Sequence, residues 1–149
     1  MPYDPNPPTE RERANAYFTV WIGLAASLVA TAAAMLPLPD RLGGFGAMVA
    51  GLWMLVCVFS RRFDSYFREL RDVGAVVALT VVALWLAVNG TAHVIGGVYA
   101  AGFALGSDGA DSAARFVLPG WIADPWLVAA LAALGFHGGF LIAQFRGGR

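Results

Sequence analysis

Two histidines and an asparagine are the polar side chains of this chain best suited to chemistry in an apolar environment. His93 follows Asn89 by four residues, so the two share one face of a helix, and Thr91 stands between them in the sequence. His137 lies in a glycine-rich stretch, Gly135 to Gly139. Neutral imidazoles with room beside them can serve as axial ligands of haem b. One hypothesis is therefore a redox anchor that binds haem b, or a quinone, near His93 and His137.

The composition predicts an integral membrane protein. Of the 149 residues, 58% are hydrophobic and 13% are charged, whereas soluble domains have about 45–50% and about 25%. Mean hydropathy is +0.64. Ten acidic residues balance ten basic ones, so the basic excess expected of a nucleic-acid binder is missing. A single cysteine, Cys57, excludes an internal disulfide and a thiolate metal site. We expect neither a metal nor a nucleic-acid partner.

Four stretches without charged residues are long enough to cross a bilayer as helices. We predict helices over 16–36, 43–60, 73–98 and 125–145. Together they form an all-α membrane four-helix bundle, a single transmembrane domain over residues 16–145. The third stretch, 73–107, would reach about 52 Å as one helix. We expect it to tilt, or to leave the membrane past Gly96 and Gly97; division into two spans is the alternative.

The arginines predict an orientation, and the chain has no lysine. Arg41 and Arg115 fall on one side of the predicted spans. The other eight fall on the opposite side: Arg11, Arg13, Arg61, Arg62, Arg68, Arg71, Arg146 and Arg149. By the positive-inside rule, the N-terminal tail 1–15, the loop 61–72 and the C-terminal tail 146–149 are cytoplasmic, and the loop 99–124 is outside. The expected chain is N-in/C-in, in the lipid bilayer of a bacterial inner membrane.

Small residues at four-residue spacing indicate where helices pack closely. Gly23, Ser27 and Thr31 form such a row on the first predicted helix, and Gly135 and Gly139 form one on the last. We expect these rows to be seams inside one bundle. The alternative is contact with other membrane subunits or with a second copy of the chain.

The depths of the two histidines argue against a shared haem. His93 lies about 20 residues from the cytoplasmic end of its helix and His137 about 9 residues from that of its own, so they differ in depth by roughly 17 Å. We expect an interfacial His93 and a neutral His137, because a buried charge is costly to desolvate. His137 should bond to Ser27, Thr31 or Asn89, with Ser27 favoured by depth. No cofactor is then needed, and haem b remains the alternative.

The loop between the second and third predicted helices carries a charged surface made of Arg61, Arg62, Asp64, Arg68 and Arg71. Its aromatic and leucine residues recur at helical spacing, and Asp64, Arg68 and Asp72 are spaced as an i,i+4 ladder. The loop is therefore expected to be helical. It either anchors the topology with solvated ion pairs, or it docks a partner or anionic lipid.

The layout resembles that of small uncharacterised bacterial inner-membrane proteins with four spans. The residues that carry the resemblance are Arg61, Arg62, Asp64 and Arg68 in the loop, with Arg146 and Arg149 at the end. The first two predicted helices also look like the two-helix unit of YiaA/YiaB-type membrane proteins, through Gly51-Leu52-Trp53 and Arg71-Asp72. These resemblances imply a topology and no activity.

The sequence predicts a non-enzymatic protein, because no serine or cysteine has a histidine nearby and no intramembrane carboxylate is present. The preferred hypothesis is an accessory or scaffold subunit that acts through helix–helix association. A redox anchor near His93 and His137 is one alternative. A small oligomeric transporter or channel lined by Asn89, Thr91 and His93 is the other.

Overall fold

A computed structural model describes residues 9–36, 38–59, 64–106 and 119–147 of the chain. These residues form five helices and contain no strand: α1 (Glu10–Met35), α2 (Asp40–Phe59), α3 (Ser65–Gly106), α4 (Gly120–Ala123) and α5 (Pro125–Gly147). In the described ranges, four helices are long and apolar enough to cross a membrane, over Glu10–Met35, Arg41–Phe59, Ser65–Gly102 and Pro125–Gly147. The chain is thus a helical protein of multi-pass membrane type.

Local signals in the sequence set the helix ends. Thr9 and Glu12 form a reciprocal capping box at the start of α1. Asp64 caps α3, because its carboxylate accepts from the Phe67 backbone N–H at 2.8 Å. At the start of α5, Pro125 occupies the first helical position, where its missing N–H costs nothing.

The third predicted helix, 73–98, is longer in the structure at both ends. α3 begins eight residues earlier, at Ser65, and ends eight residues later, at Gly106, as one continuous helix of 42 residues. Its early start has a physical reason, since Phe67 and Leu70 are buried in the core. At the other end, the residues predicted as outer loop continue the helix because nothing from 99 to 106 is a proline or a charge.

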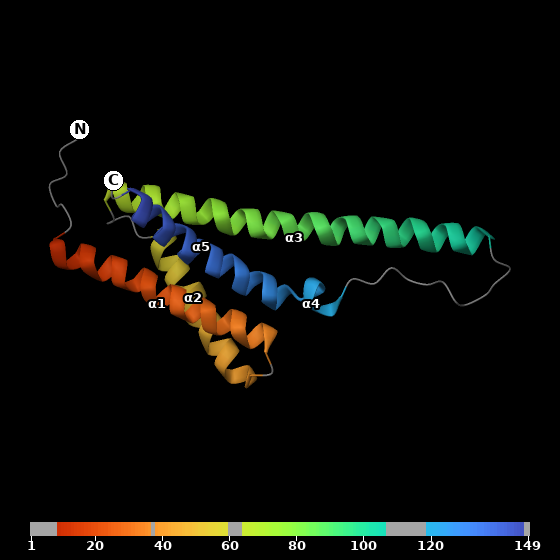
Figure 1. The fold of residues 1–149 in the computed structure, drawn as a ribbon, viewed down its shortest axis with the longest axis horizontal. Coiled ribbons are helices and arrows are strands. Elements are labelled where there is room, and N and C mark those ends of the chain that lie inside the picture. Colours follow the sequence, from red (N-terminus) through yellow and green to blue (C-terminus); the bar gives the residue numbers. More distant parts are fainter. Residues whose placement is uncertain (1–8, 37, 60–63, 107–118, 148–149) are drawn as a thin grey trace.

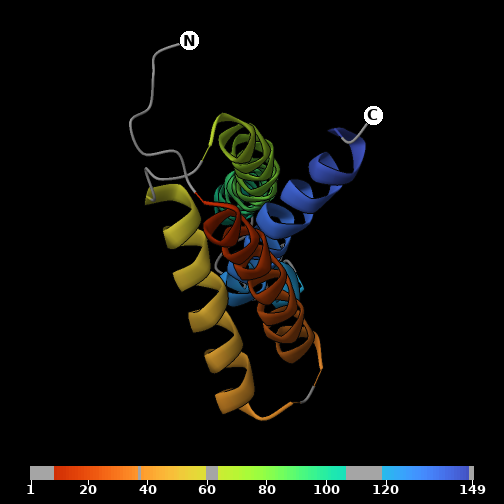
Figure 2. The ribbon, with the colours of Figure 1, turned by 90° about the vertical axis from the view of Figure 1, so that its left-hand side faces the viewer.

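α5 occupies the centre of the fold and packs against α3 and α1, while α2 packs mainly against α1 (Figure 1). In the apolar 18-residue stretch of α5, half of the residues are buried, compared with 17% in that of α2 and 11% in that of α3. The end-on view shows α1 between α2 on one side and α5 on the other (Figure 2). The core therefore lies along α5, and α2 and α3 present most of their surface outward.

Candidate functional site

The most buried polar group among the described residues is His137, on α5 where it faces α1. Its relative exposure is 0%, and so is that of Ser27 on α1. The His137 Nδ1 atom lies 3.1 Å from the Ser27 Oγ and 2.8 Å from the Ala133 carbonyl oxygen. Of the three partners expected for His137, the structure places Ser27 beside it.

The hydrogen bonds of this pair define the tautomer of the imidazole. The Ala133 carbonyl can only accept, so Nδ1 must carry the proton that lies between them. The Ser27 hydroxyl donates to the Gly23 carbonyl at 2.7 Å, which leaves its oxygen free to accept from Nδ1. The Nε2 atom is then an unprotonated acceptor, and it is buried with no hydrogen-bond partner.

Gly23 on α1 makes room for the imidazole. A Cβ atom built at Gly23 would overlap the Nε2, Cδ2 and Cε1 atoms of His137. The backbone of α1 therefore closes off Nε2, and an iron bond to that nitrogen would need α1 to move away. Thr31, the third residue of the predicted row, donates to the Ser27 carbonyl of its own helix at 2.8 Å.

A second close approach joins α3 to α5 through glycines. A Cβ at Gly139 would lie 3.0 Å from a methyl carbon of Val77 and 3.3 Å from the Gly74 Cα, and one at Gly135 would lie 3.2 Å from Val77. Gly74 is tighter still, since its Cβ would lie 2.5 Å from the Phe136 carbonyl oxygen. Both predicted glycines face α3, and Gly74 is a seam residue that the spacing patterns missed.

The structure does not bring His93 and His137 together. His137 lies level with Gly74 and Val77 of α3, whose neighbours on α5 are residues 135–139. His93 follows Val77 by 16 residues, about 24 Å along the helix. It is exposed, as is Thr91. The two histidines therefore lie far apart, His137 buried and His93 exposed.

Asn89 and Trp85 join α3 to α4, just before α5. The Trp85 indole N–H donates to the Ile122 carbonyl at 2.7 Å, and the Asn89 amide donates to the same oxygen at 3.5 Å and to the Trp85 carbonyl at 3.1 Å. These bonds satisfy a carbonyl of α4. Asn89 thus makes a structural contact in this chain.

The arginine-rich end has a different pattern of ion pairs from the predicted ladder. Asp64 meets Arg13 of α1 at 3.6 Å, and Asp72 meets its neighbour Arg71 at 2.7 Å. Arg68 is exposed and belongs to neither pair. Asp64 therefore joins the starts of α1 and α3 in addition to capping α3. Arg61 and Arg62 lie outside the described residues.

An aromatic cluster that the sequence patterns did not predict lies just inside this end. The Phe67 and Phe140 ring centroids are 4.8 Å apart, and Tyr17 meets both rings edge-on at 5.6 and 6.1 Å. The three rings come from α3, α5 and α1. Tyr17 packs against the buried core, where it contacts rings from two other helices.

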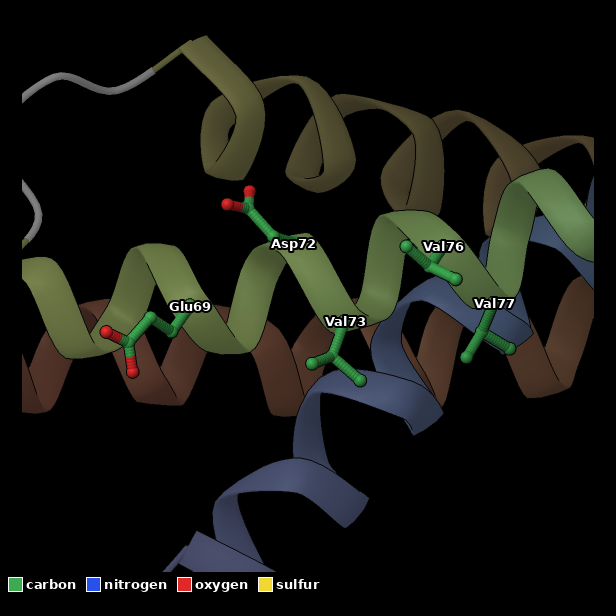
Figure 3. Close-up of a pocket in the computed structure, with 5 residues that line it drawn as sticks. All are labelled: Glu69, Asp72, Val73, Val76 and Val77. Atoms are coloured by element: carbon green, nitrogen blue, oxygen red, sulfur yellow. The ribbon is translucent and has the colours of Figure 1, made fainter.

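A shallow groove of about 410 Å³ lies on α3, lined by Glu69, Asp72, Val73, Val76 and Val77. Figure 3 shows the two carboxylates ahead of the three valines along the helix. Asp72 already pairs with Arg71, and the valines form an apolar floor. The residues that line the groove hold no arrangement of acid, base and nucleophile.

Comparison with protein families, with curated proteins and with solved structures found no match to this chain. Its function must therefore be inferred from the chain's own residues.

Proposed function

We propose that this chain is a small, non-enzymatic subunit of a bacterial inner membrane that acts through helix–helix association. The observation that carries the proposal is the outward face of α2, formed by Gly44, Met48, Gly51 and Leu55. Their spacing of four, three and four residues keeps them on one face of the helix.

The outward face of α2 is uncovered in the described chain. Met48 is 60% exposed and Leu55 is 54% exposed. A Cβ at Gly44 or at Gly51 would meet nothing within 4 Å. The opposite face of α2 is the one that packs inward, since Ala50 and Cys57 are fully or nearly fully buried there. Gly44 and Gly51 thus form two notches, where the backbone carries no side chain, on either side of Met48 on the outward face of α2.

Notches of this kind favour a partner helix in a membrane. Lipid tails are as apolar as leucine, so helices in lipid associate through close packing, which small residues permit. The polar groups of the spans support a structural rather than a chemical role. The hydroxyls of Ser27, Thr31 and Thr80 all donate to backbone carbonyls of their own helices.

We further propose that both termini are cytoplasmic. Eight of the ten arginines fall in the two tails and in residues 61–72, which is the bias of the positive-inside rule. A partner would then meet α2 within the bilayer and could also reach the arginine-rich end.

Photo-crosslinking in cells tests the proposal. A photoreactive amino acid at position 48 should give one discrete protein adduct, and the Gly51→Leu substitution should abolish that adduct by filling the notch. Leu79, which is 67% exposed on α3, provides the matched position, and no adduct is expected there.

Three results would overturn the proposal. They are no protein adduct at position 48, an adduct that persists in the Gly51→Leu variant, or a purified protein with a stoichiometric haem spectrum. Gly138→Leu is the control substitution, because a Cβ there also meets nothing within 4 Å. It should leave the adduct unchanged.

A further inference from the structure

α3 is longer than any membrane crossing requires. Its 42 residues extend about 63 Å, whereas about 20 residues cross a hydrocarbon core of about 30 Å. Arg71 and Asp72 are its last charged residues, and none follows from Val73 to Gly106. Counted from Val73, an upright helix leaves the core near residue 92, and one tilted by about 40°, the upper end of the usual range, leaves it near residue 98.

Contacts within the fold show that the other helices stop meeting α3 shortly before this window. Ile122, just before α5, is hydrogen-bonded to Trp85 and Asn89 of α3. Its neighbours Trp121 and Trp126 are 65% and 63% exposed, as expected for rings at a membrane–water interface. Figure 1 shows α3 continuing well past α4 and the other helices.

The part of α3 after His93 is apolar on all sides. Val94 is 66% exposed, Ile95 50%, Val98 69%, Tyr99 52% and Leu105 91%. Adjacent residues such as Val98 and Tyr99 point about 100° apart, so a single partner helix would cover only part of this surface. A helix that is apolar all round is not stable in water. Lipid is the surrounding that covers such a segment from several sides.

We propose that α3 bends at Gly96–Gly97 in a bilayer, so that Val98–Gly106 lies along the membrane surface opposite Arg71. The glycine pair falls inside the window from residue 92 to 98 where the helix leaves the core. Sharp helix bends occur at glycine pairs, and a Cβ at Gly97 would meet nothing within 4 Å, so no neighbour holds this point straight. Tyr99 follows directly and suits the interface. The occupant of this apolar surface is therefore lipid, at the boundary between headgroups and acyl chains.

Nitroxide scanning tests the proposal on the full-length protein in vesicles of phosphatidylcholine and phosphatidylglycerol. Single labels are placed at positions 98 to 102 in a Cys57→Ala background. For a segment lying in the surface, accessibility to oxygen and to a water-soluble nickel chelate should oscillate in opposite phase with the helical period. The Gly97→Leu substitution should abolish the oscillation. Gly90→Leu should preserve it, because Gly90 is equally open but lies before the exit.

Each other outcome overturns the proposal. Nickel accessibility that rises steadily from 98 to 102 means that the helix stands in water. High oxygen and low nickel accessibility at every position means that the segment stays inside the hydrocarbon core. Low accessibility to both reagents means that protein, a partner or a second copy, covers it. An oscillation that survives Gly97→Leu refutes the hinge. None of these outcomes involves α2, so the proposed function is tested separately.

Discussion

At the scale of single residues, the contact between His137 and Gly23 decides how α1 meets α5. The imidazole is fully buried, and its Nδ1 atom has two acceptors, the Ala133 carbonyl and the Ser27 hydroxyl. A buried polar group that keeps its hydrogen bonds avoids most of the desolvation cost. The opposite edge of the ring touches α1 where Gly23 has no side chain. The pair therefore combines a hydrogen bond with a steric fit.

Gly23→Ala should destabilise the fold by about 1–3 kcal/mol, because the new methyl group overlaps the imidazole. In a His137→Ala background the same substitution should cost much less, since the ring is gone. A double-mutant cycle of unfolding free energies, measured by denaturation in mixed micelles, should give a coupling above about 0.5 kcal/mol. Gly51→Ala is the control, with no loss expected at an open position. Additive effects would show that the two residues do not meet.

The sequence limited the hydrogen-bond partner of His137 to three candidates but could not decide among them. Depth favoured Ser27 over Thr31 and Asn89, and the structure places Ser27 at the imidazole. Thr31 instead bonds its own helix, and Asn89 bonds Ile122. Depth follows from counting residues along one helix. The rotation of two helices about their axes depends on the whole packing arrangement, which no local pattern encodes.

At the scale of elements, Asp64 fixes the start of α3. The charges of the loop predicted a surface segment, whereas the carboxylate of Asp64 caps a helix whose first turn buries Phe67. Asp64→Ala should lower stability by about 0.5–2 kcal/mol through loss of the cap. Asp64→Asn keeps a capping oxygen and loses only the partly exposed ion pair with Arg13, so it should cost less than about 1 kcal/mol. Thermal unfolding in detergent distinguishes them, and equal losses would contradict the capping role.

The seam between α3 and α5 provides a test with adjacent glycines. A side chain at Gly139 would press on Val77 and Gly74, whereas one at Gly138 would meet nothing within 4 Å. Gly139→Leu should destabilise the protein by about 1–3 kcal/mol through overpacking, and Gly138→Leu should leave the midpoint of detergent denaturation nearly unchanged. Similar midpoints for both variants would mean that this face of α5 is not packed against α3.

Sequence spacing could identify Gly135 and Gly139 as a packing face but could not find Gly74. Two glycines four apart form a pattern within one helix. Gly74 and Ala78 are four residues apart, but such pairs are common among the many alanines and glycines of this chain, so spacing does not single Gly74 out. Its importance arises from the Phe136 carbonyl of another helix, which lies 2.5 Å from the position of its missing Cβ. Such a contact arises only when the two helices pack, so the sequence of either helix alone does not reveal it.

At the scale of the whole molecule, the last helix of the chain occupies the centre. Chain order alone suggests that neighbours pack, as α1 and α2 do, yet α5 lies between α1 and α3. Composition predicted a helical membrane protein, because the share of apolar residues can be counted without knowing how the helices are arranged. The order of helices in space could not be predicted, since it depends on pairs such as Ser27–His137 and Phe67–Phe140, which are far apart in the sequence.

The topology of the whole chain can be tested with reporter fusions. Eight of the ten arginines fall in the two tails and in residues 61–72, and four helices of the described residues are long and apolar enough to cross a membrane. The positive-inside rule then predicts cytoplasmic ends. Alkaline phosphatase fused after Arg149 should be inactive, because the enzyme matures only outside the cytoplasm, and a fusion between 107 and 113 should be active. A green fluorescent protein fused after Arg149 is the reciprocal control and should fluoresce. Strong phosphatase activity from the C-terminal fusion would mean either an inverted chain or an odd number of crossings. A fusion at the N-terminus distinguishes these two cases, because only inversion places both ends outside.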